Sequence, residues 1–265
     1  MGTGSHWRCQ PGASEVRMYA VRFYKGDYPQ RQRQASADGC VAYVEQHFNS
    51  SSRADADYAV VIVGANASQT SRSWGRWYAA AVAREFGIPL GGDAGLRVGG
   101  YNGRGDANLR YTAMPALLLE PLFASNPRHA EWIRGAAGQA RLAHILCESI
   151  QRFFQDGGLI GFSVGHKYKA SNPRDRGATV VGGGSEADYA EQVLRRAQAL
   201  LTGAAAPVVG RTVRVVQGET VLWTGRVDED ADVTWDPVRG LLRIDGAPAA
   251  APTTSTRRPR SARRP

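Results

Sequence analysis

The chain has 265 residues, of which 43% are hydrophobic and 22% are charged. This composition is typical of a folded globular protein and argues against a disordered chain. No apolar run approaches the roughly 20 residues that a membrane-spanning helix needs, so we expect no transmembrane segment. The net charge of +9 favours a polyanionic partner, whether nucleic acid, an anionic membrane or an anionic cell wall, without choosing among them.

The N-terminal segment is small, polar and rich in glycine, and lacks the apolar stretch of a secretory signal. We therefore expect residues 1–15 to be a leader outside the folded domain and the protein to be made in the cytoplasm. The three cysteines form no C-x-x-C pair, which argues against a cysteine zinc site or a disulfide framework. Cys40 and Cys147 lie in apolar surroundings and are interpreted as core residues.

Short apolar runs alternate with helical patterns along the first 200 residues. Five runs predict buried strands, over residues 16–24, 39–44, 57–63, 114–119 and 159–164. Three stretches with helical spacing of apolar residues predict helices, over residues 71–86, 126–154 and 185–201. The last of these begins with Ser185, a good N-cap. The alternation predicts an α/β fold, with a mostly parallel sheet flanked by helices.

The character of the chain changes after Gly203. Residues 204–246 contain short strand-like runs and predict a small β-rich appendage, either a separate module or extra hairpins on the main sheet. Residues 247–265 are rich in Pro, Ala, Ser, Thr and Arg, so we expect a disordered basic tail.

Ionisable side chains follow three of the predicted strands. His47 and Glu120 come just after the runs that end at Val44 and Leu119, and His166 comes two residues after Val164. In α/β sheets, reacting residues gather at the carboxyl ends of strands. Each residue alone also has an ordinary explanation, as a loop histidine or as a carboxylate that caps a helix.

A fourth residue, Glu186, lies in the first turn of the helix predicted over 185–201. Two imidazoles and one carboxylate form the ligand set of hydrolytic zinc sites. His47, His166 and Glu186 are therefore candidate ligands of one Zn²⁺ per chain. Glu120 is then the candidate general base, and so the candidate catalytic residue.

Two motifs carry a resemblance to a known family. The segment Ala116–Asn126, ALLLEPLFASN, resembles the catalytic-glutamate motif of the zinc-dependent N-acetylmuramoyl-L-alanine amidases of the amidase_3 type. Residues Gln46 to Ser50, QHFNS, are similar to the Ser-Ile-His-x-Asn motif of that family. Arg31 stands where the family has an arginine that opens a short helix.

The opening motif of that family, a Gly-His-Gly followed by a glutamate ligand, has no counterpart before Arg31. A similar segment instead comes late, in Gly161–His166, Arg176–Ala178 and Gly184–Tyr189. We interpret this order as a circular permutation, in which the final helix of the family runs directly into its first strand. Domains whose termini lie close in space tolerate such rewiring. The resemblance implies a permuted catalytic domain over residues 16–203.

Two departures from the family pattern flank the histidines. Glu45 and Gln46 replace the usual Ser-Ile before His47, and Lys167 and Tyr168 replace the usual glycine after His166. We expect a bulkier pocket mouth beside His166 and an altered fit of the substrate. His129 and His144 fall inside the predicted helical stretch 126–154 and are interpreted as structural.

The resemblance implies hydrolysis of the peptidoglycan amide between N-acetylmuramic acid and L-alanine. With no recognisable signal, a phage lysis enzyme released through a permeabilised membrane fits best, and export by an unrecognised route is the alternative. The basic tail would bind anionic wall polymers or lipid. The main alternative is a non-catalytic protein that binds cell wall or a polyanion on a degenerate amidase fold, which would purify without zinc. A nucleic-acid-binding protein is suggested by charge alone, and no specific nucleic-acid recognition motif is present.

Overall fold

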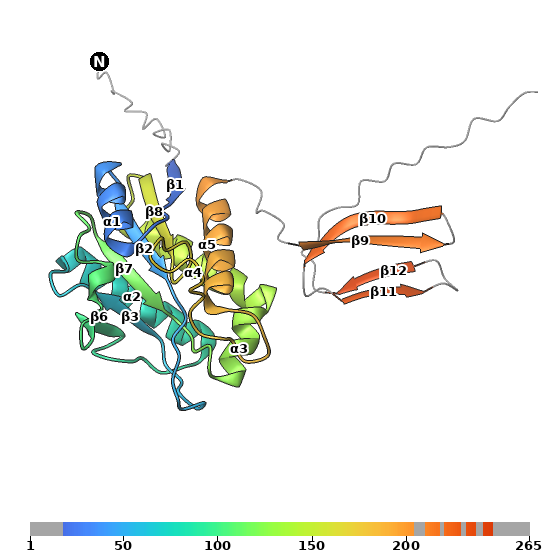
Figure 1. The fold of residues 1–265 in the computed structure, drawn as a ribbon, viewed down its shortest axis with the longest axis horizontal. Coiled ribbons are helices and arrows are strands. Elements are labelled where there is room, and N and C mark those ends of the chain that lie inside the picture. Colours follow the sequence, from blue (N-terminus) through green and yellow to red (C-terminus); the bar gives the residue numbers. More distant parts are fainter. Residues whose placement is uncertain (1–17, 204–209, 218–219, 229–231, 237–240, 246–265) are drawn as a thin grey trace, which may run out of the picture. The chain divides into compact units, whose positions relative to one another are not determined.

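The computed structural model describes residues 18–203, 210–217, 220–228, 232–236 and 241–245 (Figure 1). The leader predicted over residues 1–15 and the tail predicted over 247–265 lie outside these residues. The chain divides into two compact units between residues 207 and 208, and each is described by itself.

The first unit is built on a six-stranded sheet. Its spatial order is β1-β8-β2-β7-β3-β4, and every neighbouring pair is parallel except β7 and β3. The bounds are β1 Tyr19–Phe23, β2 Ala42–Gln46, β3 Val60–Val63, β4 Leu96–Val98, β7 Ala116–Glu120 and β8 Gly158–Val164. All five predicted runs overlap a strand, and the predicted α/β class with a mostly parallel sheet is confirmed. The short β4 was not predicted.

Five helices connect or flank these strands: α1 Tyr28–Ala37, α2 Gln69–Phe86, α3 Pro127–Arg134, α4 Ala136–Phe153 and α5 Glu186–Thr202. The single helical stretch predicted over 126–154 is wrong in one respect, since the chain divides into α3 and α4 at Gly135. This glycine has an extended ψ of 136° and ends one helix while it begins the next. The other two predicted helices correspond to α2 and α5.

The two faces of the sheet carry different cores because successive side chains of a strand point to opposite faces. On one face, Leu117, Leu119 and Phe162 pack with the buried sides of α2, α3, α4 and α5. On the other face, Tyr43 and Leu118 belong to a smaller cluster that includes residues of α1 and of the segment before β7. Between β4 and β7 lie a short hairpin, β5 Gly100–Tyr101 with β6 Arg104–Gly105, and the 3₁₀ turn η1 Asp106–Asn108.

The second unit contains two antiparallel pairs. β9 Gly210–Gln217 pairs with β10 Thr220–Asp228, and β11 Asp232–Asp236 pairs with β12 Leu241–Asp245. Each pair forms a two-stranded sheet of its own. Within the described ranges, no helix combines the length and the apolar character that crossing a bilayer requires.

Candidate metal centre and active site

Three neighbouring strands deliver the predicted site residues to one edge of the sheet. His47 directly follows β2, Glu120 is the last residue of β7, and His166 comes two residues after β8. These strands are adjacent and parallel, in the order β8-β2-β7. Their carboxyl ends therefore meet at the same edge, and the three side chains meet there although up to 119 positions separate them in the chain.

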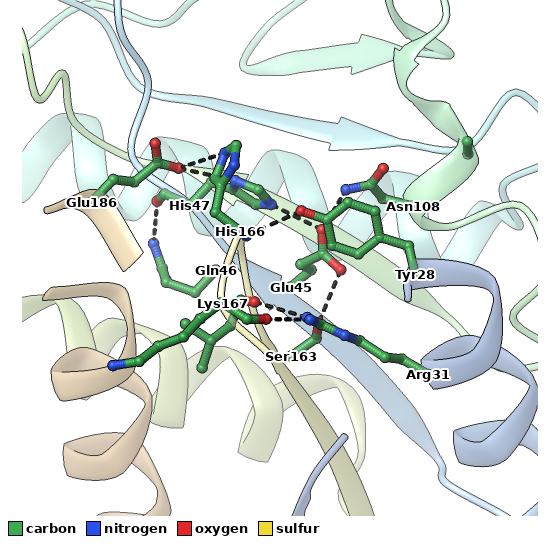
Figure 2. A network of polar contacts seen from close by, with 12 residues as sticks. Tyr28, Arg31, Glu45, Gln46, His47, Asn108, Ser163, His166, Lys167 and Glu186 are labelled. Carbon is green, nitrogen blue, oxygen red and sulfur yellow. Dashed lines mark hydrogen bonds and ion pairs between the residues drawn. The ribbon is translucent and has the colours of Figure 1, made fainter. Parts of the chain in front are cut away.

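The three predicted metal ligands converge on one point (Figure 2). Ligand atoms of His47, His166 and Glu186 all lie within 4.8 Å of one another. The Oε1 atom of Glu186 is 3.0 Å from Nδ1 of His47 and 3.4 Å from Nε2 of His166. The two imidazole rings meet edge to face, with centroids 4.9 Å apart. Within the described part of the chain, these three residues form the one group of His, Cys, Asp or Glu side chains close enough together to hold a metal ion.

Glu186 is fixed by the chain around it. Glu186 is 3% exposed and lies at the start of α5, where Ser185 is the N-cap and accepts a hydrogen bond from the Asp188 amide. The Glu186 carboxylate accepts hydrogen bonds from two backbone amides, those of Phe48 at 3.2 Å and Ala178 at 2.9 Å. A carboxylate near a helix N-terminus is also favoured by the helix dipole. The Glu186 carboxylate is thus held in place by the protein alone.

Each histidine contacts a second carboxylate through the nitrogen that faces away from the shared point. Nε2 of His47 is 2.8 Å from Glu45, and Nδ1 of His166 is 3.0 Å from Asp175. Such contacts fix the tautomer of a metal-binding histidine and leave its other nitrogen free to ligate. The atoms that face the shared point, and that would ligate a metal ion, are therefore Nδ1 of His47 and Nε2 of His166.

The charges of the site favour a cation at this point. Burial lowers the pKa of the His47 imidazole, but its hydrogen bonds to Glu186 and Glu45 outweigh burial and raise that pKa to about 10. Burial raises the pKa of Glu186, but the hydrogen bond and charge of His47 outweigh it and leave the pKa below its ordinary value. Two buried carboxylates thus hold positive charge between them, which a divalent metal ion would supply in place of the imidazole proton.

The residues present fit Zn²⁺. A tetrahedral zinc ion with bonds of about 2.0–2.1 Å needs ligand atoms about 3.4 Å apart, close to the two separations from Glu186. Two glycines make room for this arrangement. A Cβ atom on Gly165 would lie less than 3.0 Å from three ring atoms of His47, and one on Gly177 would overlap both Glu186 and His166.

Glu120 faces a pocket of about 290 Å³ that His47 and His166 also line. Its Oε2 atom is buried and accepts no hydrogen bond from the described residues. Burial, together with the charge of Glu186, raises the pKa of Glu120 to about 7 against the opposing effect of His47. The structure thus brings Glu120 to the ligand cluster as a carboxylate that can exchange a proton near neutral pH.

The expected bulky pocket mouth is wrong. Neither Lys167 nor Tyr168 lines the pocket, because the Lys167 ammonium turns away to Asp188 at 2.6 Å and Glu191 at 2.9 Å. The backbone makes this possible, since His166 itself has a φ of 62° in the left-handed region. The side chains that line the mouth include Tyr28, Tyr101, Arg104, Asn108 and Lys169.

Several buried or half-buried polar residues of the site were not assigned a role from the sequence. Glu45, Asn108, Ser163 and Asp175 contact the ligands or support one another, and Arg31, known only as a family position, is fully buried beside them. For Glu45 a signal existed, because it stands two positions before His47 and strand alternation places both on one face.

Among the described residues, His129, His144, Cys40 and Cys147 lie outside the site. His129 is fully buried and bonds Asp57 at 2.8 Å through Nε2, while its Nδ1 accepts the Phe123 amide. His144 is exposed on α4, with Nδ1 near the Ala140 carbonyl. Cys40 and Cys147 are buried, and burial raises the pKa of both thiols.

The chain was compared with known proteins. Residues 12–152, more than half of the chain, match the sequence profile of Amidase_3, described as N-acetylmuramoyl-L-alanine amidase. No match was found among curated proteins.

Solved structures with a similar arrangement include amidases from three bacteria. The catalytic domain of CwlV, an N-acetylmuramoyl-L-alanine amidase from Bacillus (Paenibacillus) polymyxa var. colistinus, is 24% identical over 49% of this chain and 66% of that chain, with a TM-score of 0.41. The amidase from Clostridium difficile 630 is 18% identical over the same shares, with a TM-score of 0.42. That from Mycobacterium smegmatis is 19% identical over 48% of this chain and 60% of that chain, with a TM-score of 0.38.

The present chain spans less than two thirds of the length of these structures. The profile match rests on the segment that contains His47 and Glu120 and ends before His166 and Glu186. Because that match covers more than half of the residues, the chain belongs to the Amidase_3 family.

Proposed function

We propose that this protein is a zinc-dependent N-acetylmuramoyl-L-alanine amidase, which hydrolyses the amide between N-acetylmuramic acid and the L-alanine of the peptidoglycan stem peptide. The observation that carries the proposal is the convergence of His47, His166 and Glu186 beside Glu120, in a chain that belongs to the amidase family. Two histidines and a carboxylate leave a fourth zinc position open for chemistry.

In the proposed reaction, the metal ion and Glu120 have separate roles. When bound, Zn²⁺ supplies Lewis-acid polarisation of the scissile carbonyl and makes water acidic enough to react at neutral pH. Glu120 accepts the proton of the attacking water and then donates it to the nitrogen of the departing L-alanine. Its raised pKa suits both transfers, because a catalytic acid–base group works best when its pKa lies near the working pH.

The metal is tested first. Purified protein should contain about one zinc per chain by elemental analysis. Substitution His166→Ala should remove most of it, because the two remaining ligands form an incomplete site. His144→Ala is the matched control, since His144 is exposed on α4 and should leave the zinc content unchanged. Full zinc occupancy in His166→Ala would contradict the ligand assignment.

The reaction is tested by mass analysis of purified peptidoglycan digested with the protein. The expected products are stem peptides with a free L-alanine amino group and glycan strands that carry intact lactyl carboxylates. Products cut between sugars or between amino acids would contradict the proposed bond. No products from a zinc-loaded protein would favour the alternative of a non-catalytic wall-binding protein, although that alternative does not explain why all four site residues are present.

The proposal includes a circular permutation of the family fold. It is supported by the profile match, which ends at residue 152, and by the position of β8 between β1 and β2 in the sheet although β8 is the last of the six strands in the chain. A second chain in which residues 158–203 precede residue 18, joined by a short linker, tests it. We expect this rearranged protein to bind zinc and cleave peptidoglycan as the natural order does, and an unfolded product would count against the permutation.

Delivery and wall binding form a further part of the proposal. We propose phage-type release, in which an enzyme made in the cytoplasm reaches the wall once the membrane is permeabilised. The basic tail, with five arginines after residue 256, would add affinity for anionic wall polymers or lipid. Expression in a bacterial host tests release, since we expect lysis only when the membrane is permeabilised. Lysis without permeabilisation would indicate another route.

A further inference from the structure

A chain of mostly buried polar groups begins at Nε2 of His47, the ring nitrogen that does not face Glu186 (Figure 2). Glu45 is fully buried, and its Oε1 atom lies 2.8 Å from Nε2 of His47 and accepts a second hydrogen bond from the Asn108 side chain at 2.5 Å. Its Oε2 atom accepts a hydrogen bond from the Ser163 hydroxyl at 2.9 Å. Both carboxylate oxygens are therefore held, and the carboxylate has one orientation.

The strands dictate this arrangement. Glu45 and Ser163 are register partners on β2 and β8, so their side chains leave the same face of the sheet. Arg31, fully buried on α1, donates from Nη1 to the Ser163 hydroxyl at 2.9 Å and to the Val164 carbonyl at 2.8 Å. It also donates to the backbone carbonyls of Gly26 and Lys167. The guanidinium thus ties α1 to the segment that carries His166.

A buried carboxylate is costly unless it is paired and hydrogen-bonded. Glu45 meets both conditions, because it takes three hydrogen bonds and has the Arg31 charge nearby. A serine at this position, as in the family motif, has a shorter side chain and no carboxylate to place against Nε2 of His47. The arrangement is therefore a feature of this chain, and it is directed at one nitrogen of one proposed ligand.

We propose that Glu45 is a positioning residue that holds His47 in the orientation and tautomer in which Nδ1 binds the metal. The inference rests on the proposed zinc site. With Nε2–H donated to Glu45, the lone pair of His47 is confined to Nδ1, which points at Glu186 at 3.0 Å. Loss of such an outer carboxylate typically weakens metal affinity 10–100-fold. The Ser163 hydroxyl and the Arg31 guanidinium orient Glu45 in turn.

The test compares zinc affinity in the full-length protein by competition with a chromophoric chelator. Glu45→Gln keeps the size of the side chain but removes its negative charge, and it replaces one of the two acceptor oxygens with an NH₂ group. We expect about 10–100-fold weaker zinc binding and a changed visible spectrum of the Co²⁺-substituted protein. Asp57→Asn is the matched control, because Asp57 bonds the structural His129 at the same 2.8 Å, and zinc affinity should stay unchanged.

The possible outcomes separate the two proposals. Wild-type protein that binds no zinc would overturn the proposed function and this inference with it. The inference alone would be overturned if the wild type binds stoichiometric zinc and Glu45→Gln binds zinc with an affinity within twofold of the wild-type value, with an unaltered Co²⁺ spectrum. If Glu45→Gln does not fold, Ser163→Ala decides. It leaves the carboxylate but removes the hydrogen bond to Oε2, and a measurable loss of zinc affinity is expected, whereas none would overturn the inference.

Discussion

Substitution Glu120→Gln separates the chemistry of the site from its architecture. The amide has the shape of the carboxylate but cannot accept a proton at neutral pH. In the structure the Oε2 atom of Glu120 is buried and has no hydrogen-bond partner among the described residues, so the change breaks no contact there. The fold and the three metal ligands should stay intact, while the proton transfers are lost.

Two magnitudes follow. A general base contributes about 10²–10⁴-fold to a rate, so turnover should fall by that factor, equivalent to about 3–5 kcal/mol in the barrier. The stability of the fold should instead increase in Glu120→Gln at high pH. The pKa of Glu120 rises from 4.5 to about 7 on folding, which at 1.36 kcal/mol for each pKa unit amounts to about 3 kcal/mol. The sign is destabilising at high pH, because the unfolded chain ionises Glu120 more readily than the folded chain does.

This cost is absent below about pH 4.5, grows as the pH rises to about 7, and is constant above it. Zinc-stripped Glu120→Gln should therefore unfold at a higher temperature than zinc-stripped wild type at pH 8. A gain of about 2–4 °C for each kcal/mol is expected for a domain of this size, and no gain near pH 4. Zinc removal matters because a bound dication would itself lower the pKa of Glu120.

The assay combines turnover of a soluble muropeptide, zinc content and thermal unfolding at both pH values. Zinc content equal to that of the wild type shows that a loss of turnover is chemical. If Glu120→Gln keeps more than a tenth of wild-type turnover with full zinc, Glu120 is not the general base. If the variant is instead less stable at pH 8, Glu120 has a structural partner and the proposed burial of an unpaired charge is wrong.

Three further predictions concern the same site and the tail. In zinc-loaded enzyme, kcat/KM should fall as pH drops through the pKa of Glu120, which lies at or below about 7 once the metal is bound, and a flat profile down to pH 4 would contradict its role. Gly165→Ala should displace the His47 ring and weaken zinc binding at least tenfold by chelator competition without unfolding the domain, because its Cβ would lie less than 3.0 Å from that ring, and unchanged affinity would refute the close packing. Deletion from Ala247 onward should weaken binding to isolated cell wall mainly at low salt, since exposed charges are screened over roughly 8 Å at physiological ionic strength, and loss of muropeptide cleavage would place the tail within the catalytic unit.

Local features of the fold were readable from the sequence because they depend on neighbours in the chain. Apolar runs of strand length predicted the five longer strands, and Ser185 predicted the start of α5. The failures were local as well. A three-residue strand such as β4 is too short to show a pattern, and Gly135 divides a helical stretch whose apolar spacing continues across it.

The sequence by itself determined which residues are chemically able to form the site. His47, Glu120 and His166 follow predicted strands, and an α/β sheet gathers such residues at one edge. The pattern does not determine which strands are neighbours, because an apolar run records that a strand is buried and not what lies beside it. That β8 lies between β1 and β2, and that β3 runs antiparallel to β7, was decided by tertiary packing.

Only the tertiary structure decided the environment of each site residue. The contact between His47 and Glu186 joins residues 139 positions apart, and the one between Glu45 and Ser163 spans 118. Such contacts depend on the folding of the whole domain. From the sequence alone, a charged residue within a strand, such as Glu45, is therefore identified only as a departure from the family motif. The same reason explains the raised pKa of Glu120, because burial is a property of the packed domain and not of the residue.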